Sequence, residues 1–259
     1  MMNILLVGNS QLACLKKAYD VQPEILGQFG DISFYVTPGG TGPYLTVNNG
    51  LLELIKEGIN PKFPPRAYPE NTPSIPLDNY DLIVVSALGY IDGGFYYPSP
   101  ATRQGIIFDF CPKPNAITSR YISVPCYKKI IEGTLLSQPG IKFLMILRKY
   151  FCKDILVQPF PLPSKDIQNH PEWPLNSMYE DVLGAHKFFC QERDLFMKNF
   201  CEKHNMTLLS YPLGIGREDY FSPPDLMGAS DGLHPTERYG ELVLRQIANA
   251  VALQGVPSE

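Results

Sequence analysis

Two short polar segments at opposite ends of the chain together hold the groups needed for nucleophilic chemistry. Residues 8–10 (Gly-Asn-Ser) end an apolar run near the N-terminus, and residues 231–234 (Asp-Gly-Leu-His) precede an amphipathic segment near the C-terminus. A serine hydroxyl is a poor nucleophile until a histidine can take its proton, and a carboxylate then holds the histidine tautomer and stabilises the imidazolium. Ser10, His234 and Asp231 are therefore candidates for a catalytic triad.

Each of these residues also has a simpler interpretation. Ser10 can cap a helix, because a serine before a helix accepts a hydrogen bond from an amide of the first turn. Asp231 can belong to an Asp-Gly turn or cap, and His234 can be an exposed residue ahead of a helix. Their presence in one chain favours the catalytic interpretation, since the Asp-x-x-His spacing lets one irregular turn bring both side chains to the same edge.

Length and composition favour a single α/β domain over residues 1–259. The chain is 44% apolar, which is enough to bury a full core. Its net charge of -4, without a block of like charges, indicates no nucleic-acid or membrane partner and favours a small or neutral substrate. The apolar run at the N-terminus is too short for an export signal or a membrane span, so we expect a cytoplasmic protein. The oligomeric state is left open.

The cysteines and histidines do not follow the spacing of a metal site. Six cysteines form no C-x-x-C pair and lie mostly in apolar patterns, which favours buried free thiols. Four histidines form no H-x-x-x-H pair. We therefore expect no metal and no cofactor.

Apolar periodicity predicts alternating strands and helices. Strands are expected at residues 3–7, 32–36, 81–87, 154–158 and 206–211, and helices at 12–19, 45–55, 125–136, 140–150, 179–204 and 236–253. The proline-rich residues 61–76 and the aromatic residues 90–110 are expected to be loops. This alternation predicts a three-layer α/β/α sandwich with a mainly parallel sheet of about five strands. Ligands bind such sheets beyond the carboxyl ends of the strands, which is where Ser10 should lie.

The two polar segments resemble the first and last sequence blocks of the SGNH/GDSL hydrolase superfamily, and the order of parts fits over nearly the whole chain. The resemblance implies an SGNH, flavodoxin-like fold in which Ser10 is the nucleophile, His234 the base and Asp231 the orienting carboxylate. Asn9 stands where the family has aspartate, and its short side chain can still bond to the local backbone.

The resemblance also implies an oxyanion hole, a set of donors for the charge that develops in acyl transfer. The backbone amide of Ser10 is one expected donor. The family usually adds a glycine amide from the loop after the second strand, and Gly40 is the best match, with Gly39 or Gly42 as alternatives. A plain glycine turn is the competing interpretation of this loop.

The third family block, G-x-N-D, is present only in part. Residues 89–92 keep its glycine and aspartate, but Ile91 stands where the family has a donor asparagine. Either Tyr90, Asn48 or Asn49 supplies the missing donor, or the hole keeps two donors, or the site is weakened. The departure bears on catalytic competence more than on the fold.

Three functions are compatible with these residues. The first is a serine esterase, acting on O-acyl groups of a carbohydrate or another small ester, with Tyr90 and Asp92 as candidate substrate contacts. The second is an acyltransferase that passes the acyl group from Ser10 to a sugar hydroxyl. The third is a glycan-binding protein on a decayed hydrolase fold, which the isoleucine in the third block would explain.

Overall fold

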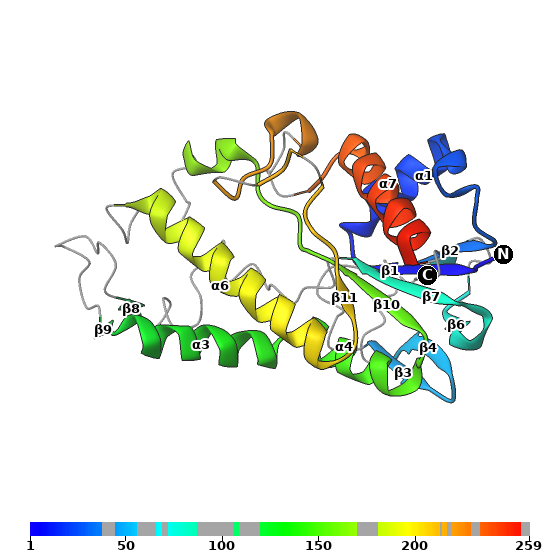
Figure 1. Cartoon of the computed structure of the whole chain (residues 1–259), viewed down its shortest axis with the longest axis horizontal. Coiled ribbons are helices and arrows are strands. Elements are labelled where there is room, and N and C mark those ends of the chain that lie inside the picture. Colours follow the sequence, from blue (N-terminus) through cyan, green and yellow to red (C-terminus); the bar gives the residue numbers. More distant parts are fainter. Residues whose placement is uncertain are drawn as a thin grey trace.

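A six-stranded sheet lies at the centre of the chain (Figure 1). In this computed structural model the described residues are 1–37, 45–55, 66–68, 72–86, 106–108, 120–169, 181–212, 214–216, 219–228 and 234–254. Five neighbouring strands are parallel, in the order β11 (Thr207–Leu208), β10 (Asp154–Gln158), β7 (Leu82–Ser86), β1 (Ile4–Gly8) and β2 (Ile32–Val36). The short strand β5 (Arg66–Tyr68) adds antiparallel to the β2 edge. The predicted mainly parallel sheet is confirmed.

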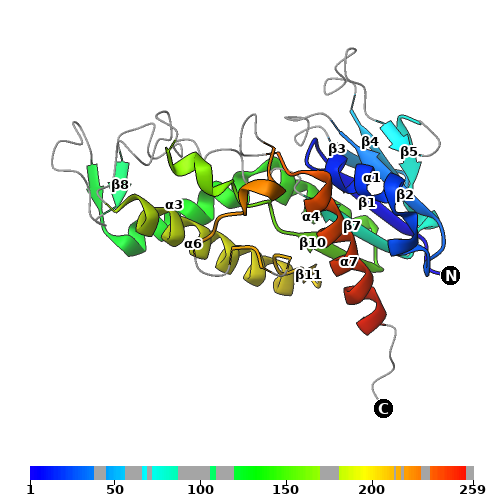
Figure 2. The same ribbon diagram turned by 90° about the horizontal axis from the view of Figure 1, so that it is seen from above.

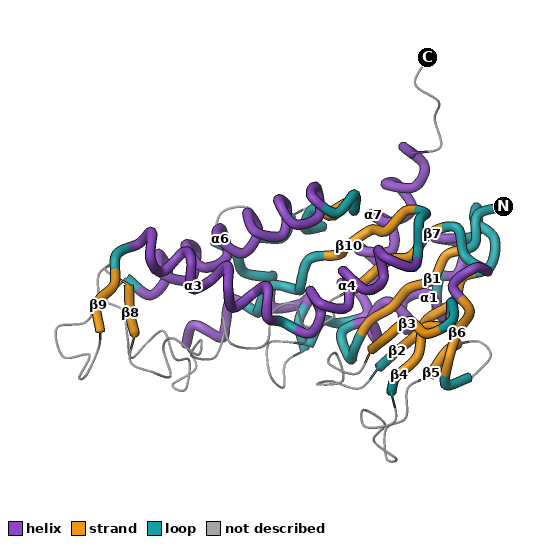
Figure 3. Tube along the Cα trace, turned by 90° about the horizontal axis from the view of Figure 1, so that it is seen from below, coloured by secondary structure: helices purple, strands orange, loops and turns teal. Residues whose placement is uncertain are grey.

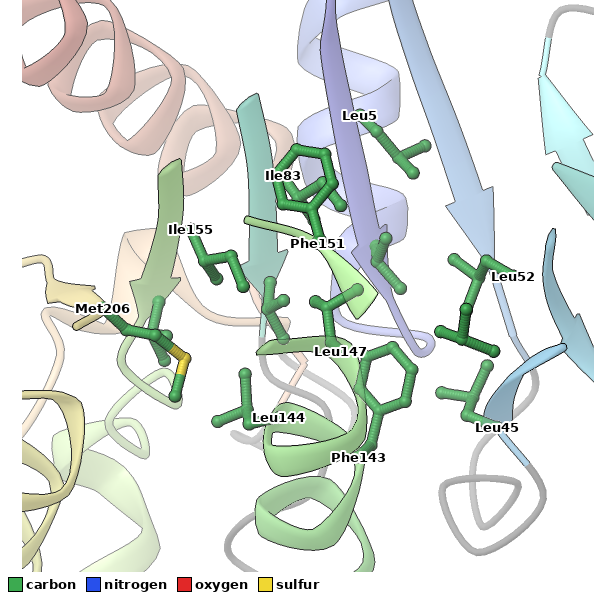
Figure 4. Close-up of a cluster of buried hydrophobic side chains, with 14 of the residues drawn as sticks. Leu5, Leu45, Leu52, Ile83, Phe143, Leu144, Leu147, Phe151, Ile155 and Met206 are labelled. Carbon is green, nitrogen blue, oxygen red and sulfur yellow. The ribbon is translucent and has the colours of Figure 1, made fainter. Parts of the chain in front are cut away.

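The central strands are apolar throughout because both of their faces are buried. Alternate residues of β1 enter two separate cores: Ile4 and Leu6 pack on one side, Leu5 and Val7 on the other. Helices α1 (Leu12–Val21) and α7 (Glu237–Gln254) cover the first face. Helix α4 (Pro139–Tyr150) and the end of α6 (Val182–Lys203) cover the second (Figure 4). The three-layer α/β/α arrangement is therefore confirmed.

The helix predicted at residues 45–55 is wrong. This segment forms a hairpin of β3 (Leu45–Asn48) and β4 (Leu51–Leu54), and β6 (Ser74–Pro76) pairs with β4. Asn49 and Gly50 connect the hairpin with φ of 49° and 76°, the backbone of a two-residue type I′ turn that Asn-Gly favours. The loop predicted for residues 61–76 is also wrong in part, since it contains β5 and β6.

Two helices extend beyond the sheet as an arm (Figures 1 and 3). Helix α3 (Val124–Ser137) runs beside the first half of α6, and a 2.6 Å ion pair between Lys128 and Glu192 joins them. The short strands β8 (Ile106–Phe108) and β9 (Arg120–Ile122) lie at its far end (Figure 2). Single 3-10 turns complete the fold: η1 (Pro23–Leu26), η4 (Leu77–Asn79), η6 (Lys165–Asn169) and η7 (Pro224–Leu226).

The five cysteines that the structure describes are free thiols, with Cys14, Cys190 and Cys201 buried. Within the same residues, no group of three or more histidine, cysteine, aspartate or glutamate side chains could hold a metal ion. No single described helix is long and apolar enough to cross a membrane, although α3 and α4, bent by 58° where they meet, reach that length and composition as a pair.

Candidate active site

Ser10 lies in a tight turn between β1 and α1. Gly8, the last residue of β1, pairs with Ser86 in β7, and a Cβ added to Gly8 would lie 2.5 Å from the Ser86 carbonyl oxygen. Only glycine fits this close approach of the two strands. After it, the Asn9 side chain accepts a hydrogen bond of 3.0 Å from the Gln11 amide, as the sequence predicted. The turn therefore holds Ser10 at the carboxyl end of the central strand.

The Ser10 side chain faces a histidine rather than capping the helix. Gln11 occupies the cap position of α1, and no side-chain hydrogen bond caps that end. Instead Ser10 Oγ lies 3.4 Å from Nε2 of His234, a residue 224 positions away in the chain. Both side chains are exposed. Hydrogen bonds of catalytic pairs are often long before a substrate binds, so this distance suits a serine and its base.

His234 is held by a short network at the start of α7. The Gly228 amide donates a 2.6 Å hydrogen bond to the His234 carbonyl, and the Thr236 amide donates to the Leu226 carbonyl at 2.9 Å. An ion pair between Arg238 and Asp225 joins the same two segments. Turn η7 therefore fixes the backbone from His234 to the first turn of α7.

Helix α7 brings His234 to Ser10 because it packs closely on α1. A Cβ added to Gly240 would lie 2.3 Å from the Cys14 carbonyl oxygen and 3.0 Å from the Leu15 amide nitrogen. The two helices therefore touch backbone to backbone, which a larger residue would prevent. Since Ser10 lies two residues before α1 and His234 three residues before α7, this contact sets the separation of the two side chains.

The other residues predicted for the site lie outside the described residues. They are Asp231, Gly40, Tyr90 and Asp92, together with the departure at Ile91. Their roles therefore stay predictions. Because Nε2 of His234 faces Ser10, an orienting carboxylate such as Asp231 would have to contact Nδ1.

Asn48 and Asn49, considered as replacement donors, are not close to Ser10. They lie at the end of the β3–β4 hairpin, which packs with α4 on the sheet face opposite α1 and α7. The Gly50 carbonyl next to them accepts from Leu77, which precedes the start of β7. This turn is therefore near the amino ends of the strands, while Ser10 is at a carboxyl end, so the Asn48 and Asn49 alternatives are wrong.

Three buried polar residues support the edge beneath Ser10, and the sequence analysis did not identify them. Ser86 Oγ donates a 2.5 Å hydrogen bond to Gln158 Oε1, and both residues are 1% exposed. They end β7 and β10 in the same register as Gly8. Thr37 donates to the Gly8 carbonyl from its amide and its hydroxyl, at 2.8 and 3.2 Å. The sequence signal that could have identified Ser86 and Gln158 is a polar residue at the last position of an otherwise apolar strand.

Comparison with known proteins gives structural neighbours only. No family model matches the chain, and no curated protein sequence does. The chain is similar in structure to an acetylxylan esterase from Geobacillus stearothermophilus, at 12% identity and a TM-score of 0.49, covering 100% of this chain and 97% of that one. It is also similar in structure to a GDSL-like lipase from Bacteroides thetaiotaomicron VPI-5482, at 12% identity and a TM-score of 0.46, covering 98% of this chain and 89% of that one.

A third neighbour is the periplasmic domain of a lipopolysaccharide acetyltransferase from Salmonella ser. Paratyphi A, at 13% identity and a TM-score of 0.47, covering 97% of this chain and 84% of that one. Because these TM-scores are below 0.5, we infer function from the strand order and from the Ser10–His234 geometry.

Proposed function

We propose that the protein is a serine ester hydrolase that uses Ser10 as nucleophile and His234 as general base. The observation that carries this proposal is the 3.4 Å approach of Ser10 Oγ to His234 Nε2 at the exposed carboxyl end of β1. The simpler role of Ser10, as a helix cap, is not realised in the structure. Open α/β sheets bind their ligands at this edge.

The reaction follows from the positions of these two side chains. Ser10 Oγ attacks the ester carbonyl while His234 takes its proton, and His234 then returns the proton to the leaving alcohol as the carbon–oxygen bond breaks. Water repeats the sequence on the acyl-serine and releases the acid. The Ser10 amide, at the start of α1, is one expected donor to the oxyanion, and the Gly40 amide is the other predicted donor.

The substrate class that we propose is the O-acyl ester of a carbohydrate or of another small alcohol. A sugar hydroxyl can replace water in the second half of the reaction, which would make the protein an acyltransferase. Incubation with an acyl donor and a free sugar distinguishes the two, because hydrolysis yields only the acid and transfer also yields an acylated sugar.

The test of the proposal is the mass of the intact protein after incubation with a fluorophosphonate. We expect a single adduct on the parent and none on Ser10→Ala. The control is Ser137→Ala, which removes an exposed hydroxyl that bonds to the Thr134 carbonyl on α3 and should label as the parent does. His234→Ala should slow hydrolysis of a short acyl ester by about 10²- to 10⁴-fold, the usual contribution of a positioned acid–base group.

Two results would contradict the proposal. One is an adduct that persists on Ser10→Ala. The other is a folded parent that neither labels nor cleaves esters, which would favour the glycan-binding protein on a decayed hydrolase fold.

A further inference from the structure

A cleft of about 370 Å³ lies beyond the carboxyl end of β10. Its walls come from two parts of the chain that are distant in sequence: the start of η6 on one side, and residues 214, 216, 219 and 221–223 on the other. They include Lys165, Asp219, Phe221, Ser222 and two glycines, Gly214 and Gly216. This volume is at the small end of the range for ligand pockets, and none of these residues was singled out from the sequence.

The polar groups of the cleft suit a neutral, hydroxyl-bearing ligand. Lys165 Nζ lies 3.0 Å from Asp219 Oδ2, and the Phe221 amide donates to Asp219 Oδ1 at 3.2 Å. Partial burial opposes ionisation, but the Lys165 and Phe221 hydrogen bonds outweigh it and keep the pKa of Asp219 below its usual value. The pair therefore presents ammonium donors and a carboxylate acceptor with no net charge, which favours hydroxyl groups over a phosphate or an acyl chain.

The walls of the cleft are built before any ligand arrives. Ser222 links the two segments: its amide donates to the Pro163 carbonyl at 2.8 Å, its hydroxyl to the Leu162 carbonyl at 2.8 Å, and its carbonyl accepts from the Lys165 amide at 3.1 Å. Behind the cleft, the buried imidazole of His186 stacks on the Phe221 ring with centroids 4.3 Å apart. Such preorganisation lowers the entropic cost of binding.

The cleft is on the same edge of the sheet as Ser10 and His234. Strand β10 is parallel to β1 and is the second strand from it, so the chain that leaves β10 toward Lys165 starts from the same edge of the sheet as Ser10. Pro223 of the cleft leads directly into η7, and Gly228 after η7 donates to the His234 carbonyl. Figure 1 shows this segment, in orange, leading into the start of α7.

We propose that this cleft binds the alcohol part of the ester substrate, and that this part is a sugar or another polyol. The inference rests on the proposed ester hydrolysis at Ser10. With the ester carbonyl at Ser10, the leaving alcohol extends along the edge of the sheet, where Asp219 accepts and Lys165 donates hydrogen bonds to its hydroxyls. The cleft selects the alcohol and takes no part in bond cleavage.

The test compares two acetyl esters in the parent and in two variants. 4-Nitrophenyl acetate has no hydroxyl groups, whereas a mono-acetylated methyl glucoside keeps three. We expect Asp219→Ala and Lys165→Ala to lower kcat/KM for the glucoside ester by roughly tenfold each, the loss typical of a hydrogen bond to a charged group. Hydrolysis of 4-nitrophenyl acetate should change less than about twofold, because that ester makes neither hydrogen bond.

The control variant is Lys129→Ala, which breaks an exposed ion pair with Glu132 on α3 and should leave the ratio of the two rates unchanged. A measurement on the parent alone adds a second test: methyl glucoside should inhibit 4-nitrophenyl acetate hydrolysis. Equal losses for both esters in the cleft variants, or no inhibition by methyl glucoside, would overturn the inference. Failure of the proposed function is distinguishable, since Ser10→Ala would then still cleave 4-nitrophenyl acetate.

Discussion

His186 makes the stability of the protein depend on pH in a predictable direction. The imidazole is 1% exposed, and its Nε2 donates a 2.9 Å hydrogen bond to the carbonyl of Tyr220. Burial lowers the pKa of His186 to about 4. The positive charge of nearby Arg193 lowers it further, whereas the hydrogen bond to the Tyr220 carbonyl acts in the opposite direction. In the unfolded chain the same group titrates near its ordinary value of about 6.5.

The sign follows from which state binds the proton first. As pH falls below about 6.5 the unfolded chain takes up a proton at His186 while the folded protein does not, so folding loses stability until the pH passes about 4. A difference of about 2.5 pKa units corresponds to roughly 3 kcal/mol in full. Between pH 7.5 and pH 5, roughly 2 kcal/mol of that should be lost.

The assay is urea unfolding of the parent and of His186→Gln at pH 7.5, 6 and 5. Glutamine can still donate to the Tyr220 carbonyl but does not titrate, so the stability advantage of the parent over the variant should shrink by roughly 2 kcal/mol across this range. Phe221→Leu is the control, because it disturbs the same stacked pair but keeps the imidazole and with it the pH dependence of the parent. A difference between parent and His186→Gln that does not change with pH would refute the reasoning.

Two further substitutions test the packing around the site. Gly240→Ala should lower the free energy of unfolding by about 1–3 kcal/mol and reduce ester hydrolysis, because its methyl group would overlap the Cys14 backbone. In the matched change Gly133→Ala, where an added Cβ meets no atom within 4 Å, stability should rise by about 0.5–1 kcal/mol. Ser86→Ala removes the donor to Gln158 Oε1 and should cost about 1–3 kcal/mol. Urea unfolding measures all three, and a Gly240→Ala protein as stable and active as the parent would contradict the helix-contact argument.

The inner strands β1 and β7, and most of β2 and β10, were predictable because they are buried on both faces. Residues 32–36 and 154–158 match β2 and β10 residue for residue. In residues 45–55 the same apolar signal was ambiguous: Val47, Leu51 and Leu54 fit the spacing of a helix. The Asn-Gly pair at 49–50 decided for a hairpin, because a type I′ turn stabilises two paired strands and interrupts a helix.

The candidate site was predictable only where one chain segment determines the position of a residue. Ser10 and His234 each precede a helix that covers the sheet, so their approach could be expected from the order of elements. Lys165 and Asp219 come from two loops that meet through the bridge between Ser164 and Ser222, and nothing in their spacing predicts that contact.

The separation of Ser10 and His234 is a property of the whole fold. Neither side chain belongs to a helix, and the closest shared support is the contact of α1 with α7 at Gly240 and Cys14. On the sheet side, Thr37 fixes the end of β1 by its bonds to the Gly8 carbonyl. A catalytic pair needs its atoms held to within about 0.5 Å. Gly8 and Gly240 allow that precision because each lets two backbone segments pack in direct contact. Substitutions at these two glycines should therefore slow ester hydrolysis although neither residue carries a catalytic group.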